Sequence, residues 1–439
     1  MKPPQVTHAI QAYEGVVRVE LHGEVDLAVA GEVAGWLEGA IDGHPGKDLE
    51  VDLSALEFLD SSGIRTLLNA YSIATRNGRA FRITGAAGGV REVLEIVGAY
   101  HLLASGNQRQ RPLVGKGMQA IQVTQPGGPE VLRVAQVASP EAGPGQVLVD
   151  LVAAGVNFIE IYQREGRYPV PLPFTPGTEG AGVVSAVGPD VDNVKPGDRV
   201  ASVELAGAYA AQALAKADRV VPIPDGIETE VAGAAMLQGL TAHYLLKDVY
   251  PVKPGDTILV HAAAGGVGLL LTQLAVALGA RVIGTVSTEE KERLARGAGA
   301  AEVIRYTEQD VAKQVRRLTD GAGVAAVYDA VGKDTFDASL ESLRVRGTLA
   351  LYGAASGVVP PFDPMRLQLA GSVFLTRPTL RDFVLDPEEL RRRAGDVLGW
   401  VANGTLKIRI HERYPLAEAR RAHEDLQARR TTGKLLLVP

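Results

Sequence analysis

The sequence predicts an α/β protein of several domains, and three observations support this prediction. With 439 residues, the chain is too long for one ordinary hydrophobic core. Residues 104–117 (ASGNQRQRPLVGKG) are polar, basic and punctuated by glycine, with no sustained hydrophobic period, as expected of a linker. On either side of them, strand-like and helix-like patterns alternate. We therefore expect two units with separate cores, residues 1–103 and the chain from Met118 onwards.

The first unit has the pattern of a small α/β layer fold. Alternating apolar residues predict strands at residues 17–21, 49–53 and 81–84. The i, i+3, i+4, i+7 spacing of an amphipathic helix falls on Ile64, Leu67, Leu68 and Tyr71. Asn77-Gly78 ends this helix, and a further helix is expected around residues 90–97.

The second unit divides into three segments. Residues 118–235 are rich in strands, glycine and proline. In residues 236–375, and clearly from Gln238, apolar strands alternate with helices, which predicts a doubly wound parallel sheet covered on both faces. Residues 376–439 carry strands that we expect to return to the β-rich part.

A glycine-rich turn gives the strongest chemical signal. Ala263-Ala264-Gly265-Gly266-Val267-Gly268 follows an apolar strand at 257–260 and opens a helix at 269–278. Glycine lets the backbone approach a pyrophosphate closely, and the helix N-terminus directs its N–H groups at the phosphates. The position between strand and helix predicts a Rossmann dinucleotide site that includes Ala263 and Gly265–Gly268.

The next strand, residues 281–286, bears on the choice of coenzyme. It ends in Ser287-Thr288, whereas an NAD site usually has Asp or Glu there for the ribose 2′-hydroxyl. Lys291 follows within one turn and can reach a 2′-phosphate. We therefore expect NADPH, with Ser287 and Lys291 at its phosphate end, although Glu289 and Glu290 lie close by in the sequence.

Composition excludes several classes of site. Cysteine is absent, which excludes disulfides, a thiol nucleophile and cysteine-ligated zinc or iron–sulfur sites. The N-terminal sequence lacks signal-peptide features, and no apolar run reaches the roughly 18 residues of a membrane helix. We expect a cytoplasmic protein without a membrane segment. Of the net charge of −6, residues 1–110 hold −5 (9 Lys and Arg against 14 Asp and Glu), so no basic field suggests nucleic acid binding.

Residues 118–439 resemble the zeta-crystallin-like quinone oxidoreductases, a zinc-free branch of the medium-chain dehydrogenase/reductase superfamily. The matching segments are GGPEVL at 127, GVNFIEIYQREGRYP at 155, PGTEGAGVV at 176, KPGDRV at 195, LQGLTAHYLL at 237, HAAAGGVG at 261, VYDAVGKDTF at 327, LTRPTL at 375 and TTGKLLLVP at 431. The resemblance implies a GroES-like catalytic domain with an inserted Rossmann domain. It also implies NADPH-dependent reduction of quinones, with enone or enoyl-thioester reduction as the alternative, and a homodimer.

Site residues follow from the resemblance position by position. Asn157 and Tyr162 match residues beside the nicotinamide and substrate pocket, and Thr241 matches one near the nicotinamide ribose or amide. Lys291 and Tyr306 match family residues that contact the 2′-phosphate end of the cofactor. Tyr352 matches an aromatic residue beside the cofactor, and Arg429 resembles a basic residue of the same site. Ala354 stands where the family often has a polar residue.

Zinc-dependent relatives have cysteine where this chain has Asn157 and histidine where it has Thr178; Glu179 remains, and we interpret it as structural. No catalytic metal is therefore expected. Without metal or thiol, Asn157 and Tyr162 either hydrogen-bond the acceptor oxygen or only line its pocket. The quinol oxygen can take its proton from water.

Residues 13–103 resemble a STAS domain, the fold of anti-sigma-factor antagonists, through GEVDL at 23, LEVDLS at 49 and FLDSSGIRTLL at 58. The resemblance implies phosphorylation of Ser61, with Asp26 and Asp60 beside it, and an anti-sigma factor or serine kinase as partner. Asp60 can cap the following helix and leave Ser61 exposed on its first turn, although D-S-S-G is also simply a good helix start. Two hypotheses remain: an enzyme with an attached regulatory module, or a partner-switching signalling protein whose reductase domain senses NADPH.

Overall fold

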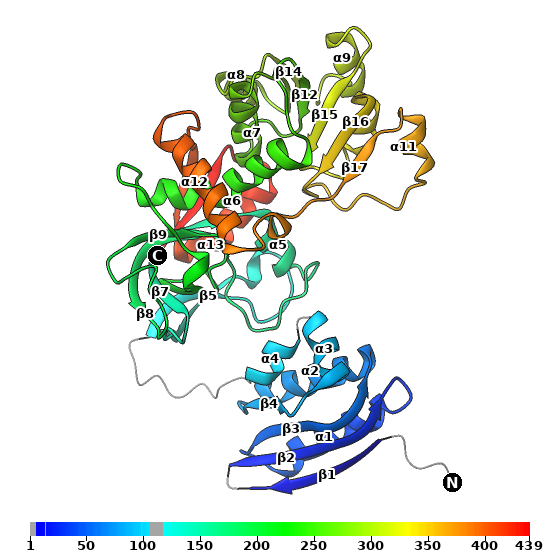
Figure 1. Cartoon of the computed structure of the whole chain (residues 1–439), viewed down its shortest axis with the longest axis vertical. Helices are drawn as coiled ribbons and strands as arrows, with labels where there is room; N and C mark the ends of the chain where they lie inside the picture. Colours follow the sequence, from blue (N-terminus) through cyan, green and yellow to red (C-terminus); the bar gives the residue numbers. More distant parts are fainter. Residues whose placement is uncertain (1–5, 14, 98, 106–116) are drawn as a thin grey trace. The chain divides into compact units, whose positions relative to one another are not determined.

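The computed structural model describes residues 6–13, 15–97, 99–105 and 117–439. The chain divides into two compact units, Met1–Lys116 and Gly117–Pro439, each with its own hydrophobic core (Figure 1). Most of the predicted linker, 104–117, lies outside the described residues. Its described ends belong to α4 (Tyr100–Ser105) and β5 (Gly117–Gln122).

In the described part of the first unit, four strands form one sheet in the order β1-β2-β3-β4. The strands are β1 (Val6–Ala12), β2 (Val16–Val25), β3 (Asp48–Leu59) and β4 (Phe81–Thr84), and the helices besides α4 are α1 (Ala30–Gly43), α2 (Ser61–Arg76) and α3 (Gly88–Ile96). β1 is antiparallel to β2, whereas β2–β3 and β3–β4 are parallel. Parallel neighbours need crossovers, which α1 and α2 supply.

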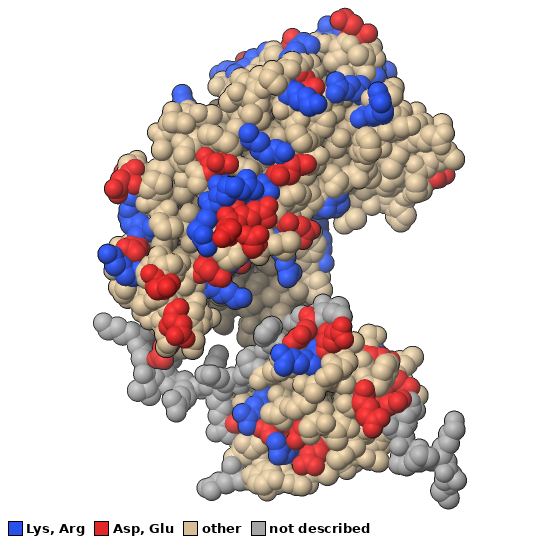
Figure 2. Space-filling model, in the orientation of Figure 1, with Lys and Arg blue, Asp and Glu red and all other residues tan. Residues whose placement is uncertain are grey.

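The two faces of this sheet differ. The alternating residues of β2 and β3, among them Val19 and Val51, are buried against α1 and α2, as the sequence predicted. Their neighbours carry charge: Arg18 pairs with Glu50 at 2.8 Å on the other face, and Arg82 pairs with the same carboxylate. On the visible face of both units, basic and acidic side chains are interspersed (Figure 2).

The β-rich part of the second unit is a sheet in the order β11-β9-β8-β7-β19-β18, with β10 also paired to β7, beside an antiparallel β5–β6 pair. Its strands are β6 (Arg133–Ala138), β7 (Gln146–Val156), β8 (Gly180–Val187), β9 (Arg199–Ser202), β10 (Gln212–Lys216), β11 (Val221–Pro222), β18 (Ile410–Pro415) and β19 (Lys434–Val438). β19 lies between β7 and β18, so residues from both ends of the unit form one sheet. Of its helices, α5 (Phe158–Arg164) follows β7, and α13 (Ala419–Gln427) contributes Ala419 and Ala422 to the core of this part.

The second sheet of this unit is parallel throughout, in the order β14-β13-β12-β15-β16-β17. The strands are β12 (Thr257–Val260), β13 (Arg281–Val286), β14 (Glu302–Arg305), β15 (Val324–Asp329), β16 (Leu343–Leu351) and β17 (Phe374–Thr376). Its helices are α7 (Gly266–Ala277), α8 (Glu289–Gly297), α9 (Val311–Leu318), α10 (Phe336–Ser342) and α11 (Met365–Leu369). One face packs against α7 and α8 and the other against α9 and α10, which confirms the doubly wound prediction.

Two further helices, α6 (Thr229–Tyr244) and α12 (Pro387–Ala402), pack against each other in a shared core. α6 begins at Thr229, before the point at Gln238 where the sequence suggested that helices start. The reason is that α6 is buried on nearly all sides and is rich in alanine, so it has no amphipathic period to detect.

Candidate functional site

A cavity of about 790 Å³ lies at the carboxyl ends of β12, β13, β15 and β16, between the parallel sheet and the β-rich part. The strand order reverses at β12, and in open α/β sheets ligands bind at such a switch point. Every predicted cofactor or substrate residue except Ala263 lines this cavity. They are Asn157, Tyr162, Thr241, Gly265, Gly266, Val267, Gly268, Ser287, Lys291, Tyr306, Tyr352 and Arg429.

The glycine turn connects β12 to α7. A Cβ at Gly268 would collide with the carbonyl oxygen of Ala262, and one at Gly266 would collide with the Gln238 side chain. Gly268 meets backbone and therefore requires glycine, whereas a side chain at Gly266 would displace Gln238. α7 begins here, so the unpaired N–H groups of its first turn open on the cavity.

Ala263 has a different role from the one expected. It is fully buried and lies outside the cavity wall. Its Cβ packs on Gly284 of β13, where an added Cβ would come within 2.8 Å. Ala263 thus holds the turn against the sheet and does not face a ligand.

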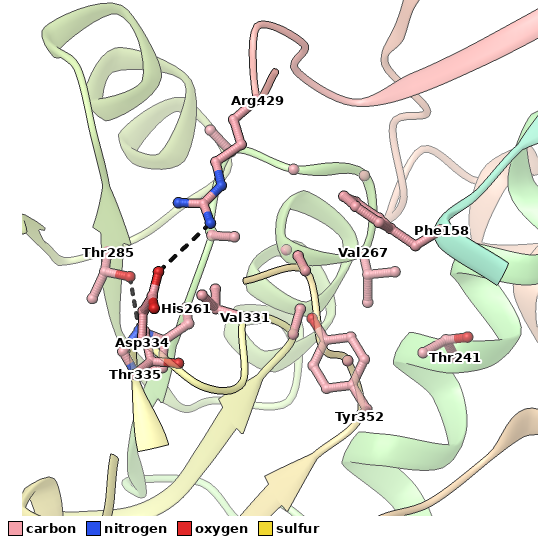
Figure 3. A pocket seen from close by; sticks show the side chains of 18 of the residues that line it. Phe158, Thr241, His261, Val267, Thr285, Val331, Asp334, Thr335, Tyr352 and Arg429 are labelled. Atoms are coloured by element: carbon pink, nitrogen blue, oxygen red, sulfur yellow. Dashed lines mark hydrogen bonds and ion pairs between the residues drawn. The ribbon is translucent and has the colours of Figure 1, made fainter. Parts of the chain in front are cut away.

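Two cationic side chains mark one end of the cavity. Lys291 Nζ donates a hydrogen bond to the carbonyl oxygen of Arg429 at 2.6 Å, and the Arg429 guanidinium lies 3.8 Å from the Asp334 carboxylate (Figure 3). Burial, and then the neighbouring Arg429 charge, lower the pKa of Lys291. An anion bound here would relieve this repulsion. Glu289 and Glu290, the carboxylates that lie near Lys291 in the sequence, are exposed on α8 and do not line the cavity.

A buried polar chain supports the sheet edge below this end. His261 lies with Nδ1 3.0 Å from Thr285 Oγ1 and Nε2 3.0 Å from Ser339 Oγ, and Ser339 donates to Asp329 at 2.7 Å. Burial lowers the pKa of His261, so the ring is neutral. These hydrogen bonds link the ends of β12, β13 and β15.

Aromatic and hydroxyl side chains form the other end, where Figure 3 shows Phe158 and Thr241 across the cavity from Arg429. The Tyr162 ring lies 5.5 Å from that of Tyr168, and burial raises the pKa of the Tyr162 phenol. The Thr241 hydroxyl donates to the Leu237 carbonyl oxygen at 2.7 Å. That proton is therefore already used inside α6, and Thr241 can only accept a further hydrogen bond.

Asn157 is more constrained than the sequence suggested. Its Oδ1 accepts a hydrogen bond from Lys434 Nζ at 2.7 Å, and its Nδ2 donates to Glu179 Oε2 at 2.9 Å. Glu179 is therefore not a lone carboxylate, because it also forms an ion pair with Lys434.

Several lining residues were not singled out from the sequence, namely Phe158, Tyr168, Gln238, Tyr244, His261 and Arg377. Tyr168 and Arg377 lie within the segments GVNFIEIYQREGRYP and LTRPTL, so those segments held the signal. Lys434 lies in TTGKLLLVP, but only the fold brings it to Asn157.

In the first unit, Asp60 caps α2. Its carboxylate accepts hydrogen bonds from the N–H groups of Ser62 (2.8 Å) and Gly63 (3.1 Å) and from the Ser62 hydroxyl, and that hydroxyl contact is the main reason that the pKa of Asp60 is lowered. Ser61 is exposed on the first turn, whereas Ser62 is buried. Asp26 Oδ1 accepts from the Ala28 N–H at 2.9 Å.

Among the residues that the structure describes, none of the helices is long and apolar enough to cross a membrane. No group of three or more His, Asp or Glu side chains in the same residues is arranged to hold a metal ion.

Family models match three regions of the chain. Residues 8–104 match a model described as Mlab, STAS domain; residues 143–225 match the alcohol dehydrogenase GroES-like domain; and residues 266–387 match the zinc-binding dehydrogenase model. These matches confirm the predicted fold class, a STAS domain before a GroES-like part and a Rossmann-type part.

Individual relatives cover the second unit. A quinone oxidoreductase of Pseudomonas aeruginosa is 48% identical over 321 residues, which are 73% of this chain and 99% of the relative. A 2-haloacrylate reductase of a Burkholderia species is 42% identical over 71% of this chain and 96% of its own length. A mycobacterial protein solved in complex with NADPH is 54% identical, with a TM-score of 0.72 over 73% of this chain and 100% of that one.

Proposed function

The chain belongs to the quinone oxidoreductase family, and on that premise we propose that its second unit reduces quinones by hydride transfer from NADPH without a catalytic metal. One observation carries the proposal. A single cavity joins the glycine turn and two cations at one end to Asn157 and Tyr162 at the other.

The residues present fit NADPH, which supplies the hydride when bound. The N–H groups of the first turn of α7, which follows Gly265, suit a pyrophosphate, and Lys291 and Arg429 suit a 2′-phosphate. No carboxylate follows β13 at Ser287, where NAD-specific sites hold the ribose hydroxyl.

At the other end, the chain's task is to position the acceptor. Negative charge develops on a quinone oxygen as its ring receives the hydride, so hydrogen-bond donors there stabilise the transition state. The Tyr162 phenol, kept neutral by its raised pKa, and the Asn157 amide are the donors that we assign to this oxygen. Protons for the quinol come from water.

The test is steady-state oxidation of NADPH by the purified full chain with small benzoquinones and naphthoquinones, after dialysis against a chelator. NADH is the matched comparison. We expect quinone-dependent turnover that prefers NADPH. A chain that binds NADPH by calorimetry but shows no turnover with any quinone would refute the proposal.

Activated alkenes are the second candidate acceptors. The support is the Burkholderia relative, whose name describes reduction of a carbon–carbon double bond next to a carboxylate. Including 2-haloacrylates, simple enones and an enoyl thioester in the same assay separates the candidates, since the higher kcat/KM identifies the preferred class.

We also propose that the first unit is a regulatory or protein-interaction module controlled at Ser61. The support is an exposed serine at the N-terminus of α2, in a unit that also exposes the large apolar side chains of Leu27 (74%) and Phe58 (48%), which suits a protein partner. A phosphate on Ser61 would place about two negative charges beside Asp60 and Asp26.

The test compares Ser61→Glu with Ser61→Ala. A changed quinone rate favours regulation of the enzyme. A changed affinity for an anti-sigma factor or serine kinase at constant rate favours the signalling alternative, in which the reductase unit senses NADPH. If both variants keep the wild-type quinone rate and the wild-type affinity for the partner, Ser61 does not control this module.

A homodimer through the parallel sheet is a further proposal. β17 is the edge strand of that sheet, and large apolar side chains are exposed on it and on adjacent β16 and α11, namely Val345, Met365, Leu369 and Phe374. A free edge with apolar neighbours is a pairing surface. Light scattering of wild type and Phe374→Glu tests it: a dimer that the variant dissociates is expected. The cytoplasmic location stays a prediction.

A further inference from the structure

Three polar side chains form a closed triangle beside the cavity. Asn157 directly follows β7 and caps α5, Lys434 opens β19, and Glu179 precedes β8. Lys434 and Glu179 are fully buried and ion-paired, and each also hydrogen-bonds Asn157. A buried pair of charges is costly to desolvate, so its presence needs an explanation beyond stability.

The chemistry of the two partners fixes the orientation of the Asn157 amide. An ammonium group only donates hydrogen bonds, and a carboxylate only accepts them. The amide oxygen must therefore face Lys434 and the amide nitrogen must face Glu179. Turning the amide over would place N–H against ammonium and oxygen against carboxylate.

This orientation leaves one donor unused. Asn157 Nδ2 carries two N–H groups, of which one goes to Glu179, and the other has no acceptor among the residues that the structure describes. Asn157 also lines the cavity. Two further hydrogen bonds hold the Glu179 carboxylate and the Asn157 backbone in place. Glu179 Oε1 accepts from the Leu237 N–H at 2.7 Å, and Glu160 Oε2 accepts from the Asn157 backbone N–H at 2.7 Å.

The backbone of β7 makes room for the triangle. A Cβ on Gly155 would collide with the Glu179 carboxylate and would come within 2.8 Å of Lys434 Cε. Gly155 is not in the left-handed region, so the ion pair, and not the backbone conformation, requires glycine there.

We propose that Lys434 and Glu179 are positioning residues that lock the Asn157 amide so that its second N–H is presented to the oxygen of the acceptor. This inference rests on the proposed quinone reduction. Lys434 and Glu179 touch neither acceptor nor coenzyme; they act through Asn157.

The test is a double-mutant cycle in the full chain. Lys434→Met/Glu179→Gln removes both charges together and so avoids an unpaired buried charge. Because one preorganised donor is lost, we expect kcat with a naphthoquinone to fall about 100- to 1,000-fold, while NADPH binding stays close to that of wild type. Asn157→Ala should lower kcat by a similar factor, and the triple variant should fall no further.

Non-additivity is the readout that a merely structural role would not produce. Arg219→Met/Glu204→Gln is the control, since it removes another ion pair of the same unit that lies outside the cavity wall and should leave kcat unchanged. Gly155→Ala is a second perturbation, which displaces the pair without removing a charge; should the double variant not fold, it takes its place in the cycle.

The outcomes separate the two claims. Wild type without quinone turnover would overturn the proposed function and this inference with it. Wild-type turnover that the Lys434/Glu179 variant or Gly155→Ala leaves unchanged, or losses that multiply with Asn157→Ala, would overturn the inference alone.

Discussion

The buried Glu160 carboxyl makes the stability of the second unit depend on pH, and Glu160→Gln isolates that dependence. Burial raises the pKa of Glu160 from 4.5 to about 8; Lys434 opposes this shift and Glu179 adds to it, and Tyr209 is also close enough to feel the Glu160 charge. The unfolded chain releases this proton near pH 4.5, whereas the folded chain keeps it to about pH 8. The contribution of Glu160 to stability is therefore highest below pH 4.5, falls as pH rises to about 8, and is flat above.

The magnitude follows from the two values. The interval from 4.5 to about 8, at about 1.36 kcal/mol per unit, corresponds to about 5 kcal/mol. The glutamine of the variant does not titrate, and its side-chain oxygen can still accept the Asn157 N–H. The unfolding free energy of Glu160→Gln minus that of wild type should therefore rise by about this amount from pH 4.5 to pH 8.

Urea unfolding at a series of pH values measures this difference. Trp36 and Trp400 are the two tryptophans of the chain, so a Trp36→Phe background makes fluorescence report on the second unit alone. Glu388→Gln, on the exposed surface of α12, is the matched control for exchanging a glutamate for glutamine elsewhere in the unit. A difference for Glu160→Gln that does not vary with pH, or that varies no more than the control, would refute the reasoning.

Three further predictions concern single residues. Lys291→Met should weaken NADPH binding about 10- to 100-fold, the worth of a charge-assisted hydrogen bond to phosphate, and leave NADH binding unchanged by calorimetry. In wild type, because the pKa of Lys291 is lowered, NADPH affinity should fall at alkaline pH sooner than an ordinary lysine would cause; equal losses for both coenzymes in the variant would contradict the phosphate role. Gly268→Ala should abolish binding of both coenzymes, since the added Cβ meets the Ala262 carbonyl oxygen. Coenzyme binding that calorimetry still detects in this variant would refute the role of the glycine turn. Asp60→Ala should destabilise the first unit by about 1 kcal/mol through loss of the α2 cap, seen in Trp36 fluorescence, whereas Ser61→Ala, which keeps the cap, should not.

Local pattern was enough for the elements that carry the glycine turn. β12, β13 and β4 begin and end at the predicted residues, because each is a short apolar run bounded by turn residues. The sequence pattern did not predict elements that are rich in glycine or that bury few residues. α1 contains four glycines, and along β1 only Val6 is buried, so neither element was predicted.

The candidate site divides in the same way. Motif spacing predicted the turn and Lys291, and both line the cavity. It does not tell a residue that faces the cavity from one packed beneath the turn, where Ala263 lies. The role of Lys434 could not be predicted either, since the pairing of β19 with β7 joins residues from opposite ends of the unit.

That pairing has a consequence for synthesis on the ribosome. The first unit is contiguous, so it can collapse while the rest of the chain is still being translated. β7, by contrast, must wait for β19, an inner strand made almost at the end of the second unit. During that interval the edge of β7 that pairs with β19 can form hydrogen bonds with other strands. A nascent chain stalled before Lys434 would therefore carry a folded first unit and an incompletely folded second unit.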